Sequence, residues 1–186
     1  QHQTCRGVTY YADPDIAEGE RCKTRVYLPT ADARLIALNA ADGTICEDFA
    51  ENGTLHLETN MPYKTQGYYY STSAPLAIAG KIIVGGAVND NYSTQSPSGV
   101  IRAYDIDTGE LIWNFDTGNP DKTEPLGPDE TYTKNSPNSW TVMSGDSDLG
   151  LVYVPFGNRV PDQIGLNRSP SEEKYSSSVT ALDVET

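Results

Sequence analysis

Three polar side chains in two loops carry the oxygen types that hold a hard divalent cation. Asp90 and Asn91 are adjacent in the loop of residues 89–93, and Asn158 follows a glycine in the loop of residues 156–162. Carboxylate and amide oxygens are the usual protein ligands of such cations. Asp and Asn are also common in turns, because their side chains hydrogen-bond the neighbouring backbone. The three residues are therefore candidate metal ligands, with turn formation as the alternative.

Two further side chains could hold a flat, anionic molecule. Trp140 offers an indole against which a planar ring can stack, although a buried structural tryptophan is the alternative. The second tryptophan, Trp113, lies inside a repeated pattern and suits that structural role better. Arg6 can form a paired hydrogen bond with a carboxylate. Trp140 and Arg6 are thus candidates for binding a ring that bears carboxylates.

A repeated hairpin must position these residues. Residues 98–115, SGVIRAYDIDTGELIWNF, contain two β-patterned runs around a turn in which Gly109 can adopt positive φ. The same pattern occurs at residues 34–49, and its first half recurs at 179–186. Each copy has an alanine just before the turn, at Ala37, Ala103 and Ala181. The hairpin is therefore a structural repeat.

Each of the two later copies follows a further pair of predicted strands. These are residues 74–78 with 81–84, and residues 140–143 with 151–154. Four short antiparallel strands per repeat are typical of a β-propeller blade. We predict an all-β fold of about three such blades, at approximately 1–60, 70–118 and 135–186, with polar connections at 50–70 and 117–134. A propeller closes with about four to eight blades, so the chain is expected to be a segment of one.

Composition excludes several functions and limits the disulfides. The net charge is −13 and no cluster of Lys or Arg occurs, which argues against binding of nucleic acid or anionic membrane surfaces. No apolar run approaches the roughly 20 residues of a membrane-spanning helix. The three cysteines lack the spacing of a zinc site and allow at most one disulfide. We expect Cys5 to pair with Cys22.

Four stretches resemble the membrane-bound, quinone-dependent glucose dehydrogenases of bacteria. They are HQTCRGVTY (2–10), NDNYS (89–93), SGVIR with DTGEL (98–102 and 107–111), and NSPNSW (135–140). These enzymes belong, with methanol dehydrogenase, to the pyrroloquinoline quinone (PQQ) family, whose fold is an eight-bladed propeller. The resemblance covers essentially the whole chain, but only the first part of a family propeller.

The resemblance implies a role for each candidate residue. Trp140 would be the floor beneath PQQ, and Arg6 and Thr72 would contact the cofactor. His2 occupies the position where methanol dehydrogenase has adjacent cysteines above the cofactor. Asp90, Asn91 and Asn158 would hold Ca²⁺ or Mg²⁺, whereas Val160 stands where some relatives have threonine. Solvent exposure is the alternative for His2, and a strand-start role is the alternative for Thr72.

The implied activity is oxidation of glucose or another aldose to the lactone, with electrons passing to ubiquinone. The family's catalytic aspartate and lysine lie beyond this segment, so no catalytic base is assigned and the isolated segment is expected to be inactive. Membrane attachment is expected only through a region preceding the chain, at the periplasmic face of the bacterial inner membrane. A non-catalytic propeller scaffold and a dehydrogenase for another alcohol are the alternatives. Open blade edges are expected to favour self-association.

Overall fold

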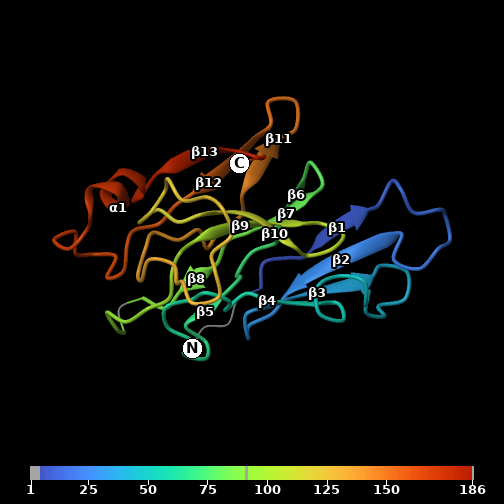
Figure 1. Ribbon diagram of the computed structural model, residues 1–186, viewed down its shortest axis with the longest axis horizontal. Coiled ribbons are helices and arrows are strands. Elements are labelled where there is room, and N and C mark those ends of the chain that lie inside the picture. Colours follow the sequence, from blue (N-terminus) through green and yellow to red (C-terminus); the bar gives the residue numbers. More distant parts are fainter. Residues whose placement is uncertain (1–4, 91, 186) are drawn as a thin grey trace.

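Short antiparallel strands make up nearly all of the regular secondary structure (Figure 1), which confirms the all-β prediction. The computed structural model describes residues 5–90 and 92–185. A first sheet has the order β1-β2-β3-β4 and a second the order β6-β7-β9-β10. A third sheet has the order β11-β12-β13, and β5 pairs with β8 in a small two-stranded ladder. The strand bounds are β1 Thr9–Ala12, β2 Thr24–Pro29, β3 Arg34–Asn39, β4 Thr54–His56, β5 Tyr69–Tyr70, β6 Leu76–Ile78, β7 Lys81–Val84, β8 Ala87–Val88, β9 Ile101–Asp105, β10 Leu111–Phe115, β11 Ser144–Asp146, β12 Leu151–Pro155 and β13 Val179–Asp183.

The second sheet is buried on both faces because it lies between the other two. Successive side chains of a strand point to opposite faces. In β7, Ile82 belongs to the core shared with the first sheet, which includes Tyr27 and Leu35. Ile83 belongs to a second core, shared with Val152 of the third sheet. Two apolar layers thus hold three sheets together.

The junctions between sheets use the same repeat positions twice. The carbonyl of Ile106, three residues after Ala103, accepts a hydrogen bond from the Tyr27 hydroxyl of the first sheet. The carbonyl of Val184, three residues after Ala181, accepts one from Trp113 Nε1 of the second sheet at 2.9 Å. Ile106 and Val184 are themselves buried. Each hairpin turn is therefore anchored to the preceding sheet.

Buried cations repeat at the same junctions. Arg25 pairs with Asn39 in the β2–β3 register and Lys81 pairs with Asp105 in the β7–β9 register, so the two cations occupy equivalent positions. Arg25 Nη1 donates to the Asp107 carbonyl at 3.2 Å, and Lys81 Nζ lies 2.7 Å from Glu185 Oε2. Each cation thus reaches the turn of the next sheet.

The first repeat departs from the predicted hairpin. The outer strand of its sheet is β4, Thr54–His56, and not residues 44–49. Cys46 and Phe49 are fully buried, and Ala50, Asn52 and Gly53 then take positive φ values that turn the chain back along β3. The predicted connection at 50–70 therefore contains a strand of the first sheet and also β5.

Two further predictions of secondary structure require correction. The strand expected at residues 140–143 lies at Ser144–Asp146 instead, where it pairs with Leu151–Tyr153 of β12, while the Trp140 carbonyl accepts from side chains of other segments. A short helix, α1 Pro170–Tyr175, was not expected. Its signals are a capping box, in which Ser169 accepts from the Glu172 N–H and Glu172 accepts from the Ser169 N–H, and a proline in the first turn.

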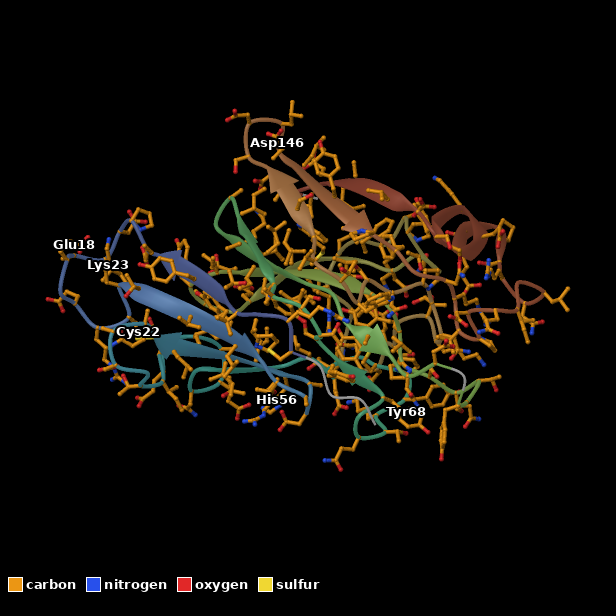
Figure 2. The ribbon with its side chains drawn as sticks, turned by 180° about the vertical axis from the view of Figure 1, so that it is seen from behind. Glu18, Cys22, Lys23, His56, Tyr68 and Asp146 are labelled. Carbon is orange, nitrogen blue, oxygen red and sulfur yellow. A yellow bond between two sulfur atoms is a disulfide. The ribbon has the colours of Figure 1, made fainter. Side chains whose placement is uncertain are left out.

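The predicted Cys5–Cys22 disulfide is wrong. Cys22 is bonded to Cys46, with a Cα–Cα distance of 5.8 Å, and Cys5 is free and exposed. Cys22 lies just before β2 and Cys46 lies after β3, so antiparallel pairing brings them to the same end of the sheet. Cys5 precedes β1, whose start pairs with Tyr27 toward the opposite end of β2. Figure 2 shows Cys22 at the margin of the first sheet.

Removing the disulfide should lower the free energy of unfolding by about 3 kcal/mol, because the bond closes a loop with a sequence separation of 24 residues. The measurement is urea unfolding of Cys22→Ala/Cys46→Ala against the wild type. Cys5→Ser is the control and should leave the midpoint unchanged. Equal midpoints for all three proteins would contradict the prediction.

The Asp107 carboxyl should make stability depend on pH. Burial, followed by the negative charge of Asp13, raises the pKa of Asp107 to about 6. Since the pKa of an unfolded Asp is about 4, the stability that Asp107 contributes is fully present below about pH 4 and is lost as the pH rises through about 6. We expect the Tm of Asp107→Asn, relative to wild type, to increase between pH 4 and pH 7.

Thermal unfolding followed by circular dichroism measures this difference. Asp129→Asn, which removes one exposed carboxylate, is the matched control for the change in net charge. A Tm difference for Asp107→Asn that is constant with pH, or equal to that of the control, would contradict the assignment.

Candidate cofactor and metal site

Three side chains, two of them from candidate residues, converge on the backbone carbonyl of Trp140. The Trp140 carbonyl accepts hydrogen bonds from Arg6 Nη1 at 3.0 Å, from Ser73 Oγ at 3.1 Å and from Thr72 Oγ1. The Arg6 N–H also donates to the Thr72 carbonyl at 3.0 Å. These contacts join the segment before β1, the segment before β6 and the loop before β11. The sequence-predicted residues Arg6, Thr72 and Trp140 therefore form one cluster.

The Trp140 indole is available to a ligand. It is 48% exposed, whereas Trp113 is 3% exposed, so Trp140 is not a buried blade tryptophan. The Arg6 guanidinium carbon lies 5.2 Å from the centre of the Trp140 ring. Arg6 is itself exposed, and its side chain leaves donors beyond the one that Trp140 uses. An exposed aromatic surface and a cation thus stand side by side.

The two described metal candidates meet at a residue that the sequence analysis did not single out. Asp90 Oδ1 accepts from the Asp162 N–H at 3.3 Å, and Asn158 Nδ2 donates to the Asp162 carbonyl at 3.1 Å. The amide oxygen of Asn158 accepts from Ser177 Oγ at 2.8 Å. Asp162 Oδ1 is buried and has no hydrogen-bond partner among the residues that the structure describes. The side chains of Asp90 and Asn158 therefore contact the backbone of Asp162, whose own carboxylate has an unsatisfied oxygen.

A sequence signal for Asp162 did exist. It is the one carboxylate in the loop of residues 156–162, four residues after Asn158. Val160, between them, is 2% exposed and packs in the first apolar core. The Val160 side chain therefore supplies no polar contact to the site, and the hydroxyl that a threonine would offer at this position is absent.

Close backbone packing connects the indole with the metal candidates. Asn138 Nδ2 donates to the Gly86 carbonyl at 3.0 Å, and the Gly157 N–H donates to the Asn138 carbonyl at 2.8 Å. A Cβ added at Gly99 would lie 2.2 Å from the Pro137 carbonyl oxygen, so the segment before Trp140 requires glycine there. At Gly157 an added Cβ would lie 3.4 Å from Trp140 Nε1. Asn158 therefore follows a glycine that lies beside the indole.

Two predicted site residues, His2 and Asn91, lie outside the described residues. Within the described ranges, the one group of three His, Cys, Asp or Glu side chains close enough for a metal is Cys22, Cys46 and Asp48. The two cysteines form the disulfide, so this group is not a metal site. Asp90, Asn158 and Asp162 remain the best metal candidates.

The candidate residues fit both PQQ-like planar anions and a divalent metal ion. The exposed face of Trp140 and the Arg6 guanidinium suit a planar molecule that bears carboxylates. Because a buried carboxylate oxygen without a partner is costly, Asp162 suits a cation beside Asp90 and Asn158.

Stacked antiparallel sheets of three or four short strands, joined by loops that carry this cluster, define a segment of a β-propeller. The chain matches, over residues 1–186, the family model described as "PQQ: Glucose/ethanol/alcohol dehydrogenase, beta-propeller domain". It belongs to that family. Membership implies PQQ and a metal ion as cofactors, and it confirms the predicted fold and the resemblance to quinoproteins.

Curated proteins of similar sequence support membership of this family. The quinoprotein glucose dehydrogenase of Escherichia coli K12 is 45% identical over 192 residues, which cover 100% of this chain and 24% of the relative. Quinoprotein glucose dehydrogenase A of Acinetobacter calcoaceticus is 40% identical and is covered to 25%. The glycerol dehydrogenase large subunit of Gluconobacter oxydans is 42% identical and is covered to 24%. The chain thus spans about a quarter of the length of these relatives.

Solved structures support the fold. The quinohemoprotein alcohol dehydrogenase of Comamonas testosteroni aligns with a TM-score of 0.63 at 23% identity, over 98% of this chain and 26% of that protein. In the described part of the chain, no helix has the length and apolar character needed to cross a membrane.

Thr72→Val should loosen Trp140, because it removes a hydroxyl that donates to the Trp140 carbonyl while keeping the shape of the side chain. A lost buried hydrogen bond costs about 1 kcal/mol of unfolding free energy. We expect that loss in urea unfolding, together with stronger acrylamide quenching of Trp140 fluorescence in a Trp113→Phe background.

Thr72→Ser keeps the hydroxyl and should restore both values. Thr131→Val, at an exposed threonine, is the control for the loss of a hydroxyl elsewhere. Quenching that is the same in Thr72→Val and Thr72→Ser would show that the hydrogen bond does not hold Trp140.

Proposed function

We propose that this chain forms one wall of the PQQ and metal site of a quinoprotein dehydrogenase that oxidises glucose or another aldose to the lactone. The observation that carries the proposal is the convergence of Arg6 and Thr72 on the carbonyl of the exposed Trp140. Neither a buried structural tryptophan nor a solvated arginine would require this arrangement.

Each residue has a definite task in the proposal. Trp140 provides the surface on which the PQQ ring lies, and Thr72 and Ser73 hold that surface through the Trp140 carbonyl. Arg6 offers its remaining N–H groups to a carboxylate of PQQ. On these residues PQQ would be held beside the metal ion, where it would supply the acceptor for the hydride from the sugar carbon.

The metal would be held by oxygens of Asp90, Asn158 and Asp162. Asp162 contributes the carboxylate oxygen that has no partner among the described residues, and the hydrogen bond from Ser177 fixes the rotation of the Asn158 amide. Either Ca²⁺ or Mg²⁺ suits such ligands. No residue of this chain is assigned as the base that removes the hydroxyl proton.

The aldose assignment is supported by the relatives named as glucose dehydrogenases. Transfer of electrons to ubiquinone, a position at the periplasmic face of the inner membrane and membrane attachment through another region belong to the same proposal. A different alcohol is the second candidate, because relatives named for glycerol and for quinate or shikimate are 42% and 40% identical. The joint presence of Arg6, Thr72 and Trp140 favours an enzyme over a non-catalytic scaffold.

The proposal is tested by PQQ affinity in the protein at its full natural length. Equilibrium dialysis with PQQ, with and without Ca²⁺ or Mg²⁺, should give a Kd that rises about tenfold in Trp140→Ala, because the stacking surface is lost. Trp140→Phe should keep part of the affinity. Asp162→Asn should raise the metal concentration required for half-maximal binding.

Leu166→Ala, at a side chain that is 92% exposed, is the control and should bind PQQ like the wild type. Unchanged PQQ affinity in Trp140→Ala would overturn the site. A kcat/KM higher for glycerol or quinate than for glucose would overturn the aldose assignment and leave the cofactor site intact.

A further inference from the structure

A cavity lies apart from the Trp140 cluster, between the first and second sheets. It has a volume of about 160 Å³ and is lined by Leu55, His56, Arg102, Tyr104, Leu111 and Tyr132, among others. None of the residues of the candidate cofactor site lines it. Figure 2 shows His56 at the surface of the molecule, on the side of the first sheet. Arg102 and Tyr132, by contrast, are 1% and 4% exposed.

Arg102 is a buried cation without an ion pair in the described part of the chain. Its Nη2 donates to the Leu57 carbonyl at 2.7 Å and to the Tyr69 hydroxyl at 3.2 Å, both of which are neutral acceptors. Its Nε is buried and has no partner among the described residues. Arg25, equally buried, has a carboxylate of Asp48 at 2.7 Å. Arg102 therefore lacks the carboxylate partner that Arg25 has, and an unpaired buried charge is costly.

Tyrosines surround Arg102 but do not neutralise it. Its guanidinium carbon lies 5.6 Å from the ring centre of Tyr69 and 5.8 Å from those of Tyr104 and Tyr132. Burial raises the pKa of Tyr104 and of Tyr132, so these hydroxyls remain protonated and carry no negative charge near neutral pH. The ring faces attract the guanidinium, but its charge still has no anionic partner there.

Tyr132 contributes a second unsatisfied donor to the same cavity. Its hydroxyl is buried and has no hydrogen-bond partner among the described residues. Arg102 and Tyr132 both line the cavity, and an N–H and an O–H without partners are donors that a carboxylate accepts from. The cavity walls otherwise include the side chains of Leu55 and Leu111, which suit a hydrocarbon group.

We propose that this cavity binds a small organic monocarboxylate. Its two oxygens accept from Arg102 Nε and the Tyr132 hydroxyl, and its short carbon chain lies against Leu55 and Leu111. A water molecule occupies about 30 Å³ of liquid, so the cavity has room for more than a halide ion. One guanidinium balances one negative charge, and the apolar part of the wall at Leu55 and Leu111 disfavours a hydrated phosphate or sulfate.

Butyrate is a suitable probe and butyramide is its neutral analogue. Thermal unfolding of the protein at its full natural length is followed from 0 to 100 mM butyrate, with sodium chloride keeping the ionic strength constant. A ligand that binds only the folded state raises Tm in a saturable way, and we expect a rise of a few degrees. Butyramide should give no saturable rise.

Variants locate the binding. Arg102→Gln should abolish the saturable rise, and Tyr132→Phe should increase the half-saturating butyrate concentration several-fold. Tyr153→Phe, on β12 of the third sheet, is the matched control and should respond like the wild type. If Arg102→Gln does not fold, the proposal is tested by comparing the half-saturating butyrate concentrations of Tyr132→Phe and Tyr153→Phe.

Several outcomes would overturn the proposal. They are a wild-type protein without a saturable response, equal responses to butyrate and butyramide, and equal half-saturation in the two tyrosine variants. A stronger response to chloride or phosphate than to butyrate, at matched ionic strength, would equally overturn the assignment to a carboxylate.

Discussion

The anchoring of each hairpin turn on the preceding sheet is the constraint on which the structure depends. A single antiparallel sheet with two apolar faces cannot bury both of them alone, so successive sheets must stack at a fixed relative position. The buried carbonyls of Ile106 and Val184 fix that position through hydrogen bonds from Tyr27 and Trp113. A buried carbonyl without a partner costs about 1–3 kcal/mol. Each turn is therefore stable only where it packs against the aromatic donor of the preceding sheet.

The candidate site follows from this stacking. The Trp140 carbonyl accepts hydrogen bonds from the segments before β1 and β6. These segments meet at Trp140 because the three sheets are stacked at fixed relative positions. Gly99 allows the backbone before Trp140 to pass close to the second sheet. Site geometry is therefore a property of the junctions between sheets, and it would not survive in a single isolated sheet.

The sequence repeats predicted the antiparallel sheets because hairpin turns and alternating apolar residues are local signals. They did not predict the first sheet's outer strand, since the burial of Cys46 and Phe49 overrides the β pattern of residues 44–49. The disulfide was also missed, because its geometry depends on the register of β2 and β3 rather than on cysteine spacing. Residues that lie far apart in the sequence meet only through tertiary packing.

The candidate site was predictable to the extent that residue type and family motif identify it. Arg6, Thr72 and Trp140 were singled out from the sequence, but their common partner, a backbone carbonyl, has no sequence signature. Asp162 was not singled out, although it is the one carboxylate in the loop of residues 156–162. Its importance depends on burial and on the lack of a partner within the described residues, and neither property can be read from sequence.

The buried cations at the sheet junctions are present in two of the three sheets. Arg25 and Lys81 occupy equivalent positions and are both balanced by carboxylates, Asp48 and Glu185. In β12 the residue paired with Asp183, at the equivalent register, is Leu151. The third sheet therefore has no such cation to hold a following turn, and a sheet packed against it would have to be anchored by other contacts. Repetition in the chain thus specifies the sheets, while the polar residues at each junction make that junction distinct.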